Sequence, residues 1–261
     1  MTPISPPIEI DLVKMLWAVG LMAISICLAF WQKLGIAGSL AIATVRSVVQ
    51  LAVVGYLLDA VFDLKQPVAV AGVIGLMSLV AAREAKNRIG KKVAFALPIV
   101  FGSILVGTVL ILAYITLIVV QPDDWHSPRY LIPISGMVLG NAMNGVSIAA
   151  ERLTSSITNK ANEIETHLCL GATPQQSIDA YRTEAIKAAM IPSINTMMVV
   201  GVVTLPGMMT GQILGGVSPL LAVRYQLVIL FAITAANLIS TLLVTQALSR
   251  QFFTPAQQLN T

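Results

Sequence analysis

Polar side chains are scarce within the apolar segments of this chain, so those that occur there are the first candidates for chemistry. Arg46 and Gln50 are four residues apart, which places them on one face of a helix. Asn141, Asn144 and Glu151 share a face of a later apolar segment. Polar groups in hydrocarbon are costly and tend to face a bundle interior or a wet cavity. We therefore predict that these residues line a transport path, with an interhelical hydrogen bond as the alternative for each amide.

Arg46 is a special case because a guanidinium group stays protonated in proteins. We expect its side chain to lie in a wet cavity, near the cytoplasmic end of its helix, or against a carboxylate such as Glu151. A role in the transport path and simple extension toward the inner surface both remain open.

A second candidate site surrounds Pro206 and Gly207, which interrupt an apolar segment. Transporters place ligand sites at such helix breaks, because the break frees backbone groups. Met208 and Met209 adjoin it, and thioethers suit soft metals, although methionine more often fills gaps in a core. Glycines recur at four-residue spacing in two apolar segments, at Gly207, Gly211 and Gly215 and at Gly136 and Gly140. This spacing favours close helix packing or a gate.

Nothing in the sequence predicts an enzyme. His126 and His167 belong to no recognisable zinc-protease or nucleophile motif. The only string near a phosphate-binding loop, Gly90-Lys91-Lys92, lacks the first glycine and the final hydroxyl residue of that motif. We expect this chain to bind no cofactor, so ATP and Mg²⁺ would be bound by a partner. The metal ligands remain unknown; Asp123, Asp124 and His126 form a weak candidate set, equally consistent with a solvated turn.

The composition places these residues in a membrane protein. Of the 261 residues, 56% are hydrophobic and 11% are charged, whereas soluble domains carry about 25% charged residues. A bilayer-crossing helix needs about 20 apolar residues. We therefore predict an all-α polytopic membrane protein with about seven transmembrane helices, at 10–31, 36–58, 67–82, 93–120, 130–150, 191–215 and 219–248.

Lysine and arginine orient these spans, because they concentrate in cytoplasmic loops. The densest group follows the third span and comprises Arg83, Lys86, Arg88, Lys91 and Lys92. With that loop inside, the N-terminus lies outside and the C-terminus inside. The net charge of +4 then follows from topology and requires no nucleic acid. The group could additionally bind anionic lipid.

Residues 151–190 form a polar segment between two apolar ones. Apolar residues recur every three or four positions, at Leu153, Ile157, Ala161, Ile164 and Leu168, which predicts an amphipathic helix. Gly171 favours a helix stop, and Thr173-Pro174-Gln175-Gln176 reads as a capping box that starts a second helix. We predict a cytoplasmic helix-turn-helix hairpin. It could join two spans passively or dock a soluble partner.

Several strings resemble the FetB-like family of ABC transporter permeases, which has bacterial iron-export and plant aluminium-tolerance members. They are RSVVQLAVVGYLL (Arg46–Leu58), IPISGMVLGNAM (Ile132–Met143), LGATPQQ (Leu170–Gln176), AMIP (Ala189–Pro192) and LPGMMTGQI (Leu205–Ile213). The similarity covers nearly the whole chain. It implies one permease domain over residues 1–261, in a bacterial cytoplasmic (inner) membrane.

The resemblance also implies how the hairpin is used. It would dock in a cleft of a separate ABC-type ATPase through Glu163, Glu165, Leu170, Gly171, Ala172, Thr173 and Pro174. Glu165 and Gly171 match the spacing in the coupling loop of ABC importers, whereas residues farther along do not. The family implies a homodimer and the export of iron or another metal ion. A nucleotide sugar or other small solute, a regulatory protein that moves no cargo, and a self-sufficient channel or carrier are the alternatives.

Overall fold

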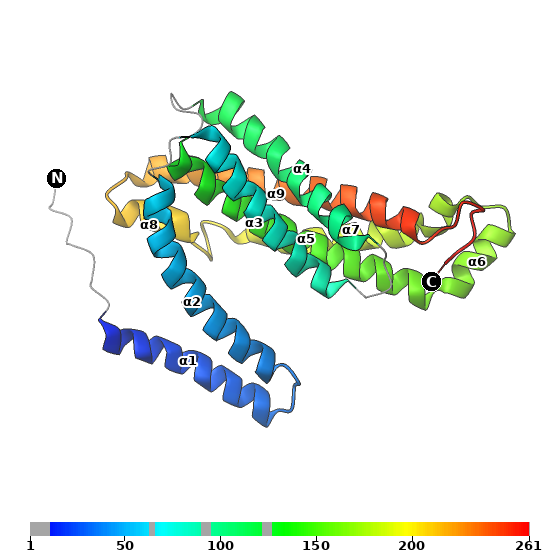
Figure 1. The fold of residues 1–261 in the computed structure, drawn as a ribbon, viewed down its shortest axis with the longest axis horizontal. Helices are drawn as coiled ribbons and strands as arrows, with labels where there is room; N and C mark the ends of the chain where they lie inside the picture. Colours follow the sequence, from blue (N-terminus) through cyan, green and yellow to red (C-terminus); the bar gives the residue numbers. More distant parts are fainter. Residues whose placement is uncertain (1–10, 63–65, 90–94, 122–126, 261) are drawn as a thin grey trace. The chain divides into compact units, whose positions relative to one another are not determined.

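The computed structural model describes residues 11–62, 66–89, 95–121 and 127–260, except for the side chains of residues 12 and 57–62. Every regular element in these ranges is helical, which confirms the all-α prediction (Figure 1). Lys91 and Lys92 of the basic group and the weak metal candidates Asp123, Asp124 and His126 lie outside the described residues.

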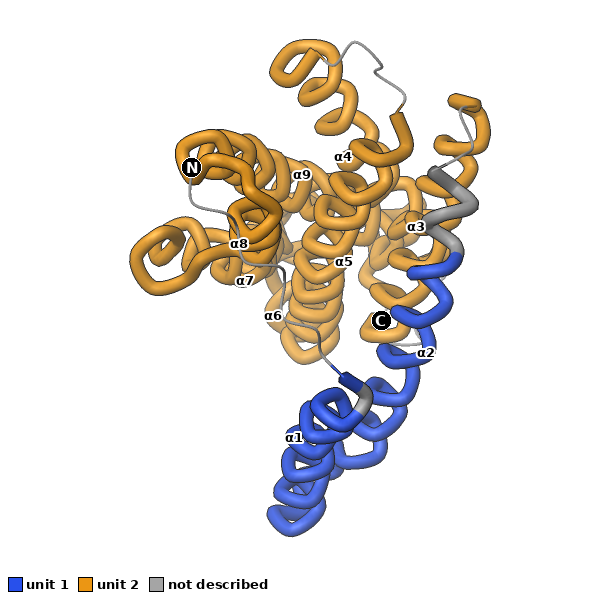
Figure 2. The backbone as a smooth tube through the Cα atoms, turned by 90° about the vertical axis from the view of Figure 1, so that its left-hand side faces the viewer, with its two compact units in different colours: residues 1–64 blue, residues 65–261 orange. Residues whose placement is uncertain are grey.

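The chain divides into two compact units, residues 1–64 and residues 65–261 (Figure 2). Unit 1 consists of α1 (Leu12–Trp31) and α2 (Ala37–Phe62), which contact each other. The turn between them contains Gly35, whose φ of +73° suits glycine. Most of the described apolar side chains of both helices are exposed, including Trp17 and Tyr56. Such surfaces are stable against lipid rather than water.

Unit 2 is a helical bundle centred on two long helices, α5 (Pro128–Asn159) and α9 (Pro219–Gln251). α5 packs against α3 (Pro67–Arg88), α4 (Ala96–Tyr114), α7 (Pro174–Val199) and α9. α4 continues into a π-helical turn, η1 (Ile115–Val120). The two short helices are α6 (Ala161–Cys169) and α8 (Gly207–Leu214).

Proline fixes where four of these helices begin. Backbone N–H groups in the first turn of a helix have no acceptor within the helix, so proline, which lacks an N–H, loses no hydrogen bond there. Its fixed φ also suits the first helical turn. The helices that start in this way are α3 at Pro67, α5 at Pro128, α7 at Pro174 and α9 at Pro219.

Six of the described helices have the length and hydropathy of a bilayer-crossing helix. They are Val13–Trp31, Ala37–Tyr56, Pro67–Arg88, Ala96–Val120, Pro128–Asn159 and Pro219–Gln251. Six of the seven predicted spans fall on them. The predicted span 191–215 is instead divided between the end of α7, an irregular stretch and α8. The polytopic architecture is confirmed, and the number and direction of crossings remain predictions.

The hairpin differs from its prediction in how it joins the bundle. No new helix begins at residue 151, because α5 runs unbroken to Asn159, a length of about 48 Å. The first arm is therefore the end of α5 followed, after Lys160, by α6. The second arm, α7, passes through Pro192 and ends at Val199. Both arms are thus continuous with, or directly attached to, helices of the bundle.

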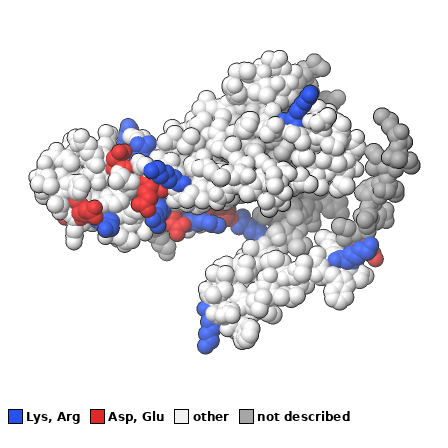
Figure 3. All heavy atoms as spheres, turned by 180° about the vertical axis from the view of Figure 1, so that it is seen from behind, with Lys and Arg blue, Asp and Glu red and all other residues white. Residues whose placement is uncertain are grey.

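The predicted apolar faces of the hairpin are confirmed. Leu153, Ile157 and Ile164 are fully buried, and Ile178 of α7 is buried with them. They form one core cluster with Leu248 and Phe252 at the end of α9. On the face that Figure 3 shows, charged side chains gather at this end of unit 2, while most of the rest of that face is uncharged. The sequence pattern thus separates a polar end from an apolar body.

Candidate functional site

The tip of the hairpin is a tight turn fixed by its own hydrogen bonds. Gly171 has a φ of +91°, and its N–H donates to the Leu168 carbonyl at 3.0 Å. The Gln176 N–H donates to Thr173 Oγ1 at 3.3 Å, and the Thr173 N–H donates to Gln176 Oε1 at 2.9 Å. These bonds confirm the predicted glycine stop and capping box.

The tip presents an apolar side chain to solvent. Leu170, at the apex of the turn, is 82% exposed. A Cβ placed on Gly171 would meet no atom within 4 Å, so the space beyond the turn is open. Ala172 and Pro174 are half-buried beneath it. The turn therefore has a rigid backbone and an uncovered surface, as a docking element requires.

Glu163 ties the two arms together below the tip. The Tyr181 hydroxyl of α7 donates to its carboxylate, and Lys160 Nζ lies 3.3 Å from Glu163 Oε2. The hydrogen bond from Tyr181, followed by the bond and charge of Lys160, lowers the pKa of Glu163 below its ordinary value. Burial, together with the Glu163 carboxylate, raises the pKa of Tyr181. The phenol is thus protonated and the carboxylate ionised at neutral pH. Glu165 is exposed on the same helix.

Two further contacts hold α7 to the bundle. Arg152 of α5 forms an ion pair with Glu184 of α7. Arg182 Nε donates to Thr245 Oγ1 of α9 at 3.3 Å, and Thr245 is itself fully buried. α7 is therefore tied to both central helices within a few turns of the tip.

A cavity of ≈ 320 Å³ lies farther along α7, where α5, α7, α8 and α9 meet. Its volume is within the range of small-molecule sites. The residues that line it are Met137, Asn141, Pro192, Ser193, Thr196, Pro206, Gly207, Met208, Gln226, Ile229, Leu230, Ile233 and Thr234. No charged side chain is among them, so amides, hydroxyls and thioethers supply the polar atoms.

One amide oxygen of this cavity lacks a hydrogen-bond partner among the described residues. Gln226 is 9% exposed, and its Oε1 atom is buried without a hydrogen bond. Asn141, in contrast, donates to the Met137 carbonyl of its own helix at 2.9 Å. A buried acceptor left unpaired costs about 1–3 kcal/mol. Gln226 is therefore the group in this cavity best placed to accept a hydrogen bond from a ligand.

The helix break beside the cavity is built from backbone turns. α7 ends at Val199, and the N–H of Val203 donates to the Val199 carbonyl at 2.9 Å. Gly201 follows with a φ of +83°, and its N–H donates to the Thr204 carbonyl at 2.9 Å. The break predicted at Pro206 thus begins six residues earlier in the chain, at Val200. Pro206 ends the irregular stretch and precedes α8.

Comparison with known proteins identifies the chain. Residues 12–253 match the model of an uncharacterised protein family, UPF0014. The chain belongs to this family. It is 47% identical to a UPF0014 membrane protein of Synechocystis sp., slr1647, over 97% of both chains. It is 32% identical to the protein ALUMINUM SENSITIVE 3 of Arabidopsis thaliana, over 96% of this chain and 90% of that one. It is 30% identical to the probable iron export permease protein FetB of Escherichia coli, over 93% and 92%.

No solved structure matches this UPF0014 chain. Its relatives are named as membrane proteins, and together with the six apolar helices they establish a multi-pass integral membrane protein. The strings that carried the resemblance also have places in the fold. Leu170–Gln176 forms the tip and cap of the hairpin. Ile132–Met143 and Leu205–Ile213 each contribute residues to the cavity.

The structure of this UPF0014 protein brings together part of the predicted transport path. Asn141, Pro206, Gly207 and Met208 line one cavity. Met209 is half-buried beside it, and Asn144 and Glu151 are exposed on α5 away from its lining. Arg46 and Gln50 are exposed on α2 of unit 1, so their proximity to Glu151 or to the cavity remains a prediction.

Of the predicted close-packing glycines, Gly136 approaches another helix, because a Cβ on it would lie 3.3 Å from Met77 Cε of α3. A Cβ on Gly140, Gly207 or Gly211 would meet nothing within 4 Å outside its own helix. A Cβ on Gly145 would lie 1.7 Å from Asn237 Oδ1, and one on Gly107 would lie 2.2 Å from Ser240 Oγ. These two glycines, from α5 and α4, receive polar side chains of α9. Neither shows the four-residue spacing on which the prediction relied.

Proposed function

We propose that this UPF0014 protein is the permease subunit of an ABC transporter that exports iron or another metal ion and is driven by a separate ATPase. The observation that carries the proposal is the continuity of α7. This helix starts at the capped tip, at Pro174, and its later turns supply Pro192, Ser193 and Thr196 to the cavity. A displacement of the tip therefore reaches the cavity through a single helix.

The hairpin tip is the proposed contact with the ATPase. Leu170 and Gly171 form its exposed apex, while Thr173 and Pro174 start the helix that transmits motion. Glu163 would keep the arms together during each cycle, because it bonds across from α6 to α7. ATP and Mg²⁺ would be bound by the partner.

The cavity is the proposed cargo site. One relative is named a probable iron export permease, which supports a metal as cargo. Among the residues that the structure describes, no group of three or more His, Cys, Asp or Glu side chains could hold a metal ion. A cavity of ≈ 320 Å³ lined by amides, hydroxyls and thioethers suits a hydrated or chelated ion better than a bare hard cation. A small polar solute is the alternative cargo.

The remaining predicted path residues belong to this proposal. Arg46 and Gln50 on α2, Asn144 and Glu151 on α5, and Met209 on α8 are candidates for the route to or from the cavity. We also expect the permease to act as a homodimer in a bacterial cytoplasmic membrane. Apolar side chains near the break, such as Val202 at 90% exposed, would then face lipid or the second copy.

The decisive test is reconstitution. The chain would be purified with a candidate ABC-type ATPase and placed in liposomes, and ATP hydrolysis and ATP-dependent iron flux would be measured together. Flux that requires both proteins supports a metal transporter. A stable, ATP-hydrolysing complex that moves no iron removes this cargo and favours another solute or a regulatory role. Iron flux without any ATPase would contradict the proposal and favour a channel or carrier.

A further inference from the structure

A second cavity, of ≈ 490 Å³, lies at the hairpin end of unit 2. α7 contributes Pro174, Gln175, Ile178, Asp179 and Arg182; α9 contributes Gln246, Ser249 and Arg250; and the chain after α9 contributes Phe253, Thr254 and Pro255. Its volume is again that of a small-molecule site. None of the described residues that line it also lines the cavity near the helix break.

The polar groups of this cavity favour an anion. Its lining includes two guanidinium groups, those of Arg182 and Arg250, and one carboxylate, that of Asp179. Arg182 is half-buried and held on one side by its bond to Thr245 at 3.3 Å, which leaves its terminal nitrogens for a ligand. Arg250 is exposed and has no ion-pair or hydrogen-bond partner among the described residues. Planar guanidinium groups bind carboxylates and phosphates through paired hydrogen bonds.

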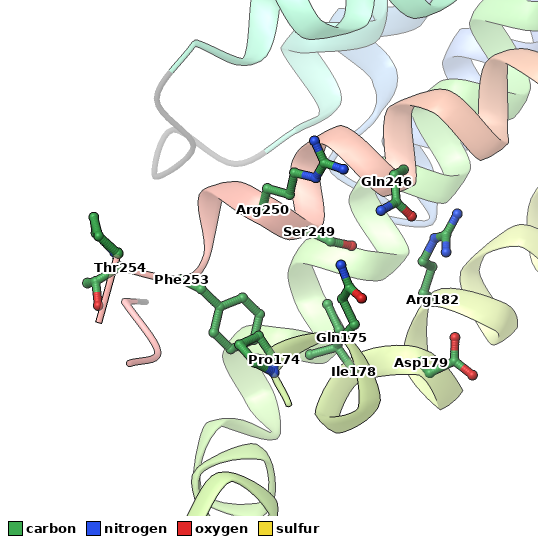
Figure 4. A pocket seen from close by; sticks show the side chains of 11 residues that line it. Pro174, Gln175, Ile178, Asp179, Arg182, Gln246, Ser249, Arg250, Phe253 and Thr254 are labelled. Atoms are coloured by element: carbon green, nitrogen blue, oxygen red, sulfur yellow. The ribbon is translucent and has the colours of Figure 1, made fainter. Parts of the chain in front are cut away.

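The arginines extend from opposite helices. In Figure 4, Gln175 and Arg182 point from α7 toward the part of the cavity where α9 carries Gln246 and Arg250. The two primary amides add donors and acceptors between the charges. An anion placed here would be bound by both helices at once.

The other part of the cavity is apolar. Ile178 is 2% exposed and forms part of the core, and the half-buried Phe253 packs against the same core. The chain after Phe253 turns back on itself, because the N–H of Asn260 donates to the Phe252 carbonyl at 2.8 Å. The aromatic ring is therefore held at the cavity by the folded tail and offers a face for a flat or apolar group.

We propose that this cavity binds a small organic anion, with a phosphate or carboxylate at Arg182 and Arg250 and an apolar body against Ile178 and Phe253. The same chemistry is available from a soluble metabolite or from an anionic lipid headgroup. The source we propose is the soluble one, because residues of the hairpin helix α7 line this cavity and charged side chains gather at the hairpin end of unit 2 (Figure 3). The bound molecule would be an effector rather than cargo, since this cavity is separate from the proposed cargo site.

The effector would act through the two helices it joins. α7 and α9 line both cavities, so a ligand that bridges Arg182 and Arg250 restrains the helices that also form the cargo site. Only this consequence depends on the proposed transport function. Binding itself can be tested without an ATPase and without flux.

Binding would be measured by calorimetry and by thermal unfolding on the full chain in lipid nanodiscs. The probes are AMP, phenyl phosphate and phenylacetate, with adenosine and benzyl alcohol as uncharged counterparts and inorganic phosphate and dihexanoyl phosphatidic acid as alternatives. We expect at least one of the three organic anions to bind saturably and its uncharged counterpart to bind at least tenfold more weakly.

Two substitutions separate a built site from general charge attraction. Arg250→Gln removes an exposed charge from the cavity and should weaken binding at least tenfold. Lys187→Gln removes an exposed charge from α7 outside the cavity and should leave binding unchanged. The proposal is overturned if none of the three organic anions binds, if both variants lose affinity equally, or if only inorganic phosphate or only the lipid binds. Binding with no effect on reconstituted flux would remove the effector role alone.

Discussion

Asn237 Nδ2 of α9 lies 2.9 Å from Ser193 Oγ of α7, and this hydrogen bond lies at the edge of the cavity near the helix break, which Ser193 lines. The Asn237 amide also approaches the Ala189 carbonyl at 3.5 Å and accepts from Thr241 Oγ1 at 3.3 Å. Along α7, Ser193 is about 16 Å from Arg182, at 1.5 Å per residue. The contact is thus a fixed point, with the hairpin on one side and the helix break on the other.

Loss of this fixed point should weaken the α7–α9 contact. Ser193→Ala removes one hydrogen bond within an apolar bundle, which costs about 0.6 kcal/mol on average. Asn237→Leu removes all three bonds and changes the side-chain shape, so its effect should be larger. Thermal unfolding in nanodiscs measures both. A Ser193→Ala variant that unfolds earlier than Asn237→Leu would contradict the assignment of Asn237 as the centre of the contact.

Gly145 should tolerate no side chain, whereas Gly140, one turn earlier in α5, should. A Cβ on Gly145 would meet Asn237 Oδ1 at 1.7 Å, but one on Gly140 would meet nothing within 4 Å. We expect Gly145→Ala to lower stability by about 1–3 kcal/mol through overpacking, and Gly140→Ala to leave it unchanged or slightly raised. Equal unfolding temperatures for the two variants would rule out the close α5–α9 approach.

The exposed tip should be required for the ATPase and dispensable for folding. Leu170→Glu places a charge where an apolar side chain is 82% exposed, so it should reduce recovery of the ATPase complex on co-purification. Gly171→Trp should do the same by filling the open space beyond the turn and by straining the turn itself, because a φ of +91° favours glycine. Asn162→Glu, exposed on α6 away from the tip, is the control. Full recovery of the complex with both tip variants would remove the docking role.

Substitution of Gln226 should affect stability and transport in opposite directions. Its buried Oε1 has no partner, so Gln226→Leu should raise the unfolding temperature while reducing ATP-dependent flux. Thr108→Val removes another buried, unpartnered oxygen, on α4 and outside the cavity lining. It should raise stability without affecting flux. Normal flux in Gln226→Leu would show that this amide does not bind cargo.

The contact between the two hairpin arms should weaken as the pH falls. Tyr181 and Lys160 lower the pKa of Glu163 from its ordinary 4.5. The stabilisation that the ionised carboxylate gives to the hairpin is therefore fully present above about pH 4.5, and it is lost as the pH falls through the lowered pKa of the folded state. Hydrogen exchange of the α6 amides measures this. Glu163→Gln should exchange faster than wild type at pH 7 and at the same rate well below pH 4. The control, Glu165→Gln, should match wild type at every pH. A difference between Glu163→Gln and wild type that persists in acid would exclude ionisation of Glu163 as the cause.

Much of this fold could be read from the sequence because its signals are local. Apolar length predicts the membrane helices, whose own backbone groups are satisfied within each segment. The Thr173–Gln176 capping box and Gly171 act over a few residues, so the tip was predictable to the residue. The apolar face through Leu153, Ile157 and Ile164 follows from helical periodicity, and the structure buries it as expected.

Only the tertiary structure decided which of these elements meet. The pairing of Asn237 with Ser193 and Gly145 joins residues 44 and 92 positions apart, and no local pattern distinguishes Gly145 from Gly140. The break after Val199 also depends on tertiary context, since its backbone groups bond within an irregular turn that helix propensity does not specify. Sequence alone determined the six apolar helices and which end of the chain's bundle is polar, because those properties depend on neighbours along the chain. Packing decided where the cavities lie, because a cavity is defined by side chains from helices that are distant in sequence.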